Sequence, residues 1–258
     1  MCLILIASNA HPHYRLIIAA NRDEWRTRPT AALHYWRTDP KILAGRDLQA
    51  GGTWLGIAGN GRIAAVTNLR CGSTTFDKPR SRGQLVSEFL RQNTATESYI
   101  AAIDRQREDF NGFNLLVGDQ TGLWRYCSAD SSTTQLGDGI HCISNGLPSE
   151  QWPKTERSQQ LLAQALKSEP PSPSSLLKLL QDSWQPPDEK LPQTGVNLEL
   201  ERQLAPIFVQ GEDYGTRSSS LLVIEHNGRW QFLERNFDRN TSADREFQGR
   251  IDACQMPT

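Results

Sequence analysis

The sequence lacks several features that would assign a protein of its length to a broad class. Its 258 residues contain no apolar run close to the roughly 18 residues that span a bilayer. The first apolar run stops at Asn9 and has no basic segment before it, so we expect no secretory signal. Lysine and arginine (28) nearly balance aspartate and glutamate (29), giving a formal net charge of −1. Without a basic surplus, nucleic acid is not an expected partner.

Cysteine usage excludes further classes. The five cysteines are odd in number and far apart, whereas disulfide frameworks and zinc sites usually show even numbers or close pairs. His11 and His13 stand two residues apart in a polar loop, which is more typical of a solvated turn than of a metal site. We therefore expect a cytoplasmic protein without a disulfide framework, a metal or a cofactor.

Hydrophobic periodicity predicts blocks of strands that alternate with blocks of helices. Strands are predicted at 2–8, 15–21, 54–58, 62–68, 113–118, 123–128, 139–144, 218–225 and 230–236. Helices are predicted at 81–92, at 96–107, at 154–167 and after Pro173. Residues 25–40 and 185–195 read as irregular loops, and the polar tail after about residue 239 as partly disordered. This order favours one α+β domain over residues 1–258, with helices on each side of antiparallel sheets.

The chain begins with a residue that can carry chemistry. Cys2 follows the initiator methionine, so removal of Met1 would place a thiol and a free α-amine on the same residue. An α-amine titrates near pH 8 and can accept the thiol proton without a histidine. The alternative is that Cys2 is simply a small buried apolar side chain.

A cysteine nucleophile needs oxyanion donors, a positive charge near the thiol and groups that orient the amine. Candidates stand at the ends of predicted strands. They are Arg22, Asp23, Asn68, Asn145 and Arg217.

Several short segments resemble one known family. Met1-Cys2 followed by Asn21-Arg22-Asp23-Glu24 is similar to the NRDE-motif family, also called the transport and Golgi organisation family. The resemblance covers nearly the whole chain. It includes Gly52-Thr53-Trp54-Leu55-Gly56, Val66-Thr67-Asn68-Leu69-Arg70, Ser81-Arg82-Gly83, Phe113-Asn114-Leu115-Leu116, Ser144-Asn145-Gly146, Pro206-Ile207-Phe208-Val209 and Tyr214-Gly215-Thr216-Arg217-Ser218-Ser219.

That family resembles in turn the N-terminal-nucleophile hydrolases of the penicillin V acylase and bile salt hydrolase group. The resemblance implies a four-layer αββα sandwich and a cysteine that cleaves a linear amide. By order and context, Cys2, Asn68, Asn145 and Arg217 match the roles of that group. The group spaces its Arg and Asp three residues apart, whereas Arg22 and Asp23 are adjacent. Which of the four NRDE residues orients the nucleophile is therefore open.

Two functional hypotheses follow. The first is a hydrolase or acyltransferase with Cys2 as its N-terminal nucleophile, acting on a linear amide or thioester of a small acyl compound. The second is a non-catalytic binding or trafficking protein on the same scaffold, handling haem, acyl-coenzyme A or lipid, with Cys2 or His34 as haem ligand. Retention of Met1 would favour the second, because it blocks the amine. The oligomeric state is open.

Overall fold

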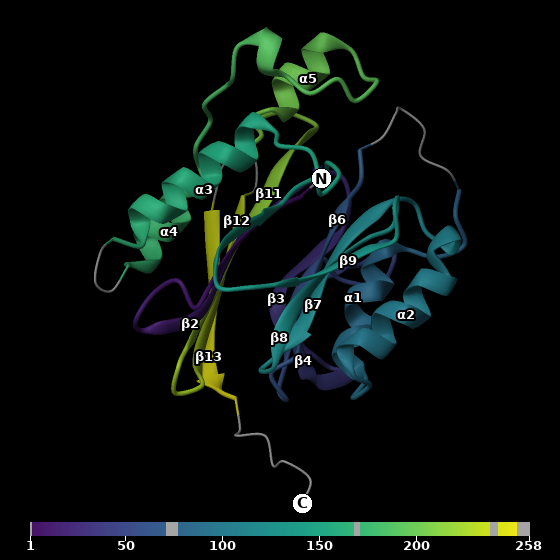
Figure 1. Ribbon diagram of the computed structural model, residues 1–258, viewed down its shortest axis with the longest axis vertical. Helices are drawn as coiled ribbons and strands as arrows, with labels where there is room; N and C mark the ends of the chain where they lie inside the picture. The colour runs from purple at the N-terminus through teal and green to yellow at the C-terminus, as the bar shows by residue number, and fades with distance from the viewer. Residues whose placement is uncertain (1, 71–76, 168–170, 238–241, 252–258) are drawn as a thin grey trace, which may run out of the picture.

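The computed structural model describes residues 2–70, 77–167, 171–237 and 242–251. Figure 1 shows two antiparallel sheets that face each other, with helices against their outer faces. Met1, Cys71 and Cys254 lie outside the described residues, and Cys2, Cys127 and Cys142 carry free thiols. The α+β class and the four-layer αββα arrangement predicted from the sequence are confirmed.

Each sheet combines strands from distant parts of the chain. The first sheet has the order β10-β1-β2-β11-β12-β13, with β10 Gly139–Ile143, β1 Cys2–Ser8, β2 Tyr14–Trp25, β11 Tyr214–Glu225, β12 Arg229–Phe237 and β13 Ser242–Arg250. The second sheet runs from β3 to β9 in sequence order, with β3 Thr30–Trp36, β4 Asp39–Asp47, β5 Leu55–Ala58, β6 Ile63–Asn68, β7 Phe113–Asp119, β8 Gly122–Cys127 and β9 Ser132–Leu136. β1 and β2 therefore lie inside the first sheet, as their continuous apolar runs require.

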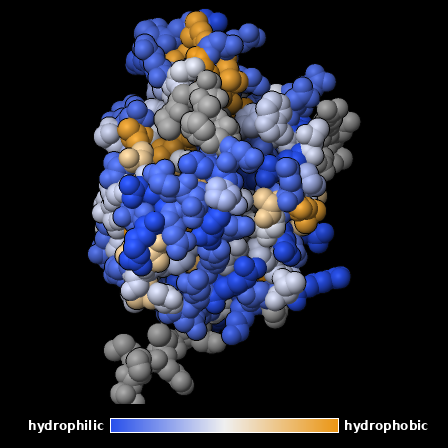
Figure 2. Space-filling view, turned by 90° about the vertical axis from the view of Figure 1, so that its right-hand side faces the viewer, coloured by the Kyte–Doolittle hydropathy of each residue, from blue (hydrophilic) through white to orange (hydrophobic). Residues whose placement is uncertain are grey.

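The helices form the two outer layers. They are α1 Arg82–Arg91 and α2 Thr96–Arg105 on the second sheet, α3 Pro153–Ala165 and α4 Pro173–Leu179 on the first, and α5 Leu198–Leu204 beyond them, with short 3₁₀ turns at Arg107–Asp109 and Asp188–Lys190. Three apolar cores fill the spaces between the four layers. Examples are Phe89 against the second sheet, Ile18 between the sheets and Leu162 against the first sheet. The face in Figure 2 is mostly hydrophilic, and apolar residues gather at the end that carries α5, where Leu198 is exposed.

Several sequence predictions were wrong. Residues 25–40, expected to be a loop, contain β3 and the start of β4, and Leu33 and Trp36 are buried. Residues 242–250 of the tail, expected to be partly disordered, form β13, because their backbone pairs with β12 although most of their side chains are exposed. The predictions also missed the rest of β4, the polar edge strand β9 and the helix α5. Residues 238–241 and 252–258 lie outside the described residues.

Two glycines bring the start of α1 against the segment between β4 and β5. The Thr53 N–H donates to the Gly83 carbonyl at 3.2 Å, and Ser81 caps the helix by accepting from the Gly83 N–H. A Cβ on Gly52 would lie 2.4 Å from the Gly83 carbonyl carbon. The glycines in Gly52-Thr53-Trp54 and Ser81-Arg82-Gly83 therefore permit a direct backbone contact.

Gly52→Ala should lower the free energy of unfolding by about 1–3 kcal/mol, because the new methyl group has to displace backbone at the start of α1. Chemical denaturation measures this change. Gly137→Ala is the matched control, since a Cβ there meets nothing within 4 Å. Equal stability of the two variants would contradict the close contact.

Candidate active site at the start of the first strand

The pairing of β1 with β2 places Cys2 directly opposite Arg22. Ile4 and Ala20, which pair two residues further along, pack in the core between the sheets. Because side chains alternate along a strand, Cys2 and Arg22 face the second sheet as well. The thiol and the guanidinium are therefore cross-strand neighbours on the inner face.

Asn21 and Asp23 belong to the opposite face of β2. The Asn21 side-chain amide donates to the carbonyls of Leu180 at 2.7 Å and Ile207 at 2.9 Å, and its oxygen accepts from Ser219. These bonds tie β2 to the segments that follow α4 and α5. Asn21 is therefore a structural residue, fully engaged in holding the end of the strand.

Asp23 is buried beside this anchor. Its Oδ1 accepts a hydrogen bond from Thr216 Oγ1 at 2.7 Å, and Tyr214 donates to its backbone carbonyl at 3.1 Å. Burial raises the pKa of the Asp23 carboxyl, and the charge of Lys154 and the Thr216 bond oppose this effect. The charge of Asp23 also contributes to raising the pKa of the Cys2 thiol, and both residues line the same pocket.

Cys2 opens onto a solvent-accessible pocket of about 120 Å³. Its described walls are Cys2, Arg22, Asp23, Glu24, Arg28, Asp47, Thr53, Trp54, Val66, Asn68, Ser81, Arg82 and Gly83. Burial raises the pKa of the Cys2 thiol, and the Arg22 guanidinium acts in the opposite direction. Arg22 lies 4.5 Å from the Trp54 ring centre and 3.5 Å from Glu24 Oε2, so its charge is held in place at this wall.

Asn68 and Asn145 meet where the two sheets are joined. The Asn145 side-chain amide donates to the Asn68 carbonyl at 2.9 Å, and the Asn145 carbonyl accepts from the Arg70 N–H at 2.7 Å. Asn145 is fully buried, and its Oδ1 has no partner among the described residues. The side chain of Asn68 lines the Cys2 pocket and makes no hydrogen bond within the part of the chain that is described. Asn145 thus positions Asn68 and keeps one acceptor unused.

Arg217 is the extra residue of a bulge in β11, between the pairs Thr216–Asp23 and Ser218–Arg22. Its Nη1 donates to the carbonyls of Trp25 and Arg28 at 2.9 and 3.1 Å. It is not among the described walls of the Cys2 pocket. The structure therefore brings Cys2, Arg22, Asp23 and Asn68 together at one pocket, with Asn145 behind Asn68, and it places Arg217 on the neighbouring turn.

Two cations near the thiol were missed by the sequence reasoning. Arg82, the first residue of α1, lines the pocket, and burial lowers the pKa of its guanidinium, while a negative charge on Cys2 would oppose this effect. Lys154 of α3 is buried and donates to the Leu204 carbonyl at 3.1 Å. The segment Ser81-Arg82-Gly83 had been noted only as a motif, and nothing in the helix pattern of α3 marks Lys154 as buried.

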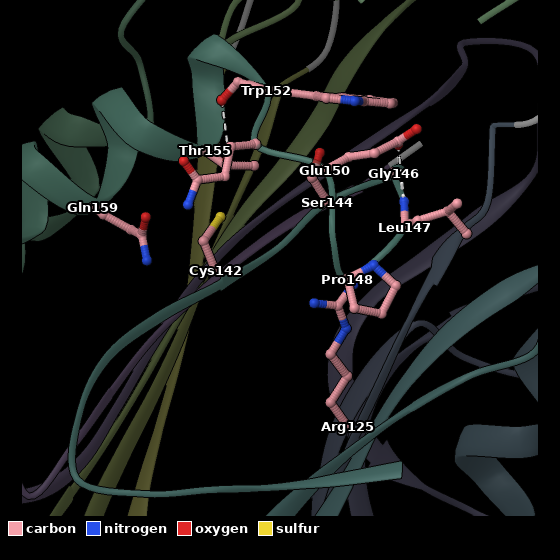
Figure 3. A pocket seen from close by; sticks show the side chains of 11 residues that line it. Arg125, Cys142, Ser144, Gly146, Leu147, Pro148, Glu150, Trp152, Thr155 and Gln159 are labelled. Carbon is pink, nitrogen blue, oxygen red and sulfur yellow. Dashed lines mark hydrogen bonds between the residues drawn. The ribbon is translucent and has the colours of Figure 1, made fainter. Parts of the chain in front are cut away.

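A second pocket lies beside α3 and contains another thiol (Figure 3). Cys142 reaches it from β10, and its sulfur lies 3.6 Å from Ser158 Oγ. Burial raises the pKa of the Cys142 thiol to about 11, so it is protonated at neutral pH. Neither Asp23 nor Asn68 is among the described walls of this pocket, which leaves Cys2 as the better nucleophile candidate.

No group of three metal-binding side chains occurs in the described residues. His34 of β3 contacts the Ala32 carbonyl through Nδ1 at 2.7 Å. Within the described ranges, every helix is too short or too polar to span a membrane.

The four αββα layers are those of the N-terminal-nucleophile hydrolase fold, and Cys2 begins β1, the second strand of the first sheet. Two structures of variants of the conjugated bile acid hydrolase from Clostridium perfringens match with TM-scores of 0.53 and 0.51. These matches cover 95% and 96% of this chain, and 92% and 97% of theirs, at 9% sequence identity. At such low identity the likeness shows the fold alone.

Sequence comparison identifies the family. The Transport and Golgi organisation 2 family matches residues 1–239, and the chain belongs to this family, as its motifs predict. The mouse Transport and Golgi organization 2 homolog is 30% identical over 264 residues, covering 94% of this chain and 95% of the mouse protein. The human homolog is 30% identical over 257 residues, covering 92% of this chain and 93% of its own length.

The buried Lys154 predicts an unusual pH dependence of stability. Burial lowers its pKa from 10.5 to about 8, so between these values the unfolded chain binds more protons than the folded one. The contribution of Lys154 to the free energy of unfolding should therefore rise with pH through this window, by up to about 3 kcal/mol. Denaturation of the wild type and Lys154→Met at about pH 7 and about pH 10 measures it. A stability difference between the two proteins that stays constant with pH would contradict it.

Proposed function

We propose that the protein is a cytoplasmic hydrolase or acyltransferase that uses Cys2 as an N-terminal nucleophile on a linear amide or thioester. The observation that supports this most directly is the shared pocket of Cys2, Arg22, Asp23 and Asn68 at the start of β1. The proposal includes removal of Met1, which would free the α-amine of Cys2.

In the first half of the cycle, the Cys2 α-amine takes the thiol proton and Sγ attacks the acyl carbon. Asn68 Nδ2 and a backbone N–H hold the resulting oxyanion, while Arg22 stabilises the thiolate. In this scheme Asp23 holds the ammonium group in position, a role supported by its place in the same pocket as Cys2. The tetrahedral intermediate then expels the amine or thiol, which takes the proton from the ammonium, and a thioester remains on Cys2.

In the second half, water or another acceptor attacks the thioester. The Cys2 α-amine takes the proton of the attacking molecule, and Asn68 again holds the oxyanion. The intermediate expels Sγ and releases the acid or the transferred acyl product. The proton on the amine returns to the sulfur. Arg217 acts in this scheme by holding the turn that follows Asp23.

The second candidate is a non-catalytic binding or trafficking protein on the same scaffold, with haem, acyl-coenzyme A or lipid as cargo. One observation favours it: burial raises the pKa of the Cys2 thiol, which disfavours a free thiolate. In this case the protein would keep Met1 and form no thioester.

Asn68→Ala should lower the rate of substrate turnover about a hundredfold, because one side-chain oxyanion donor is worth about 3 kcal/mol. Cys2→Ala should abolish turnover. Rates are measured on a panel of linear amides and thioesters of small acids. Cys142→Ala is the matched control, because it removes a buried thiol outside the proposed site, and it should keep wild-type activity. Turnover retained by Cys2→Ala would contradict the hydrolase proposal.

Intact-mass spectra before and after brief treatment with a thiol alkylator decide between the two candidates. Loss of Met1 together with preferential labelling of Cys2 is the outcome that supports the hydrolase. Retention of Met1 with an unreactive Cys2 would favour the binding protein.

A further inference from the structure

Two of the three arginines on the walls of the Cys2 pocket, Arg22 and Arg28, form ion pairs within the described residues. Both Nε and Nη2 of Arg28 donate to Asp47 Oδ2, at 2.9 and 2.7 Å. Arg22 lies 3.5 Å from Glu24, and Arg28 lies 3.8 Å from the same carboxylate. Among the described residues, Arg82 makes no ion pair and has one neutral partner, the Gly112 carbonyl, at 3.2 Å.

Arg82 is half-buried, and Nη1 is its one nitrogen with a hydrogen-bond partner in the part of the chain that is described. Arginines of this protein with a buried nitrogen that lacks a partner in the described residues are Arg15, Arg62, Arg70 and Arg125. Arg82 is not one of them, although burial lowers the pKa of its guanidinium. Arg82 lines the same pocket as the Cys2 thiol, and its only hydrogen bond within the described residues is the one from Nη1 to the Gly112 carbonyl.

The start of α1 adds to this positive potential. Ser81, Arg82 and Gly83 all line the pocket, and the first turn of this ten-residue helix contains no acidic side chain. The N-terminal end of a helix carries partial positive charge, which favours a nearby anion. Contact with Gly52 holds this end at the pocket wall.

We propose that Arg82 binds a carboxylate on the acyl compound that reacts with Cys2, so that the substrate class is that of small acids carrying a second, negatively charged group. A planar guanidinium with free donors matches a carboxylate in shape and charge. This inference rests on the proposed function, since it places the carboxylate in the same pocket as the nucleophile.

Two alkylating reagents test the proposal without a known substrate. Iodoacetate and iodoacetamide both transfer a two-carbon group to Sγ with loss of iodide, and they differ in that iodoacetate carries a carboxylate. In the wild type, the ratio of the iodoacetate to the iodoacetamide rate at Cys2 should exceed the ratio for a free cysteine peptide by about tenfold or more. Arg82→Gln should return it to the peptide value, and Arg82→Lys should retain part of the preference. Peptide mass spectrometry gives the rates at Cys2 alone.

Arg91→Gln is the matched control, because Arg91 is at the other end of α1, roughly 13 Å away along the axis, and should leave the ratio unchanged. If Arg82→Gln slows both reagents equally, Arg82 stabilises the thiolate and binds no anion, which overturns the proposal. An iodoacetate-to-iodoacetamide ratio that Arg82→Gln leaves unchanged for any other reason also overturns the proposal for Arg82. If Cys2 still reacts in that case, the proposal that Cys2 is the nucleophile stands. A Cys2 that reacts with neither reagent would contradict both proposals.

Discussion

The antiparallel register between β1 and β2 determines where the groups of the candidate site lie. It sets Cys2 opposite Arg22 and, through the alternation of side chains, sends Arg22 and Asp23 to opposite faces of the first sheet. A shift by one residue would move Arg22 away from the thiol and exchange the apolar side chains that fill the two cores on either side of the sheet, so that neither core would pack well. The apolar residues that hold β1 and β2 in register thus also determine that Cys2 and Arg22 lie opposite each other.

A second constraint is the set of buried charges behind the site. Arg70 and Glu201 of α5 form an ion pair at 2.9 Å in which both side chains are less than a tenth exposed. The Arg70 backbone also holds the Asn145 carbonyl. A buried pair of this kind contributes little net stability, but removing one partner is strongly unfavourable. The pair therefore serves mainly to fix α5 and the Asn68–Asn145 junction in one arrangement.

Much of this fold could be predicted from the sequence, because its strands and helices carry their own periodicity. The runs around Ile4 and Ile18 and the helix from Ser81 are examples. β13 could not be predicted, since its polar side chains carry no burial signal and its pairing depends on the backbone of β12. The positions of Cys2, Arg22 and Asn68 followed from strand ends. The position of Arg82 depends on a contact between Gly52 and Gly83, which are 31 residues apart in the sequence.

The spacing of Arg22 and Asp23 can be understood in the same terms. The hydrolase group separates its Arg and Asp by three residues, and this chain separates them by one. Both intervals are odd, so in a strand either arrangement sends the two side chains to opposite faces. The shorter interval brings the carboxylate roughly 7 Å closer to the arginine along the strand. The Asp23 carboxyl then needs a hydrogen-bond donor on the neighbouring strand. The bulge at Arg217 supplies one by placing Thr216 opposite Asp23. The adjacent pair and the bulge therefore belong together structurally, because without the extra residue Arg217 the Thr216 hydroxyl would not stand opposite Asp23.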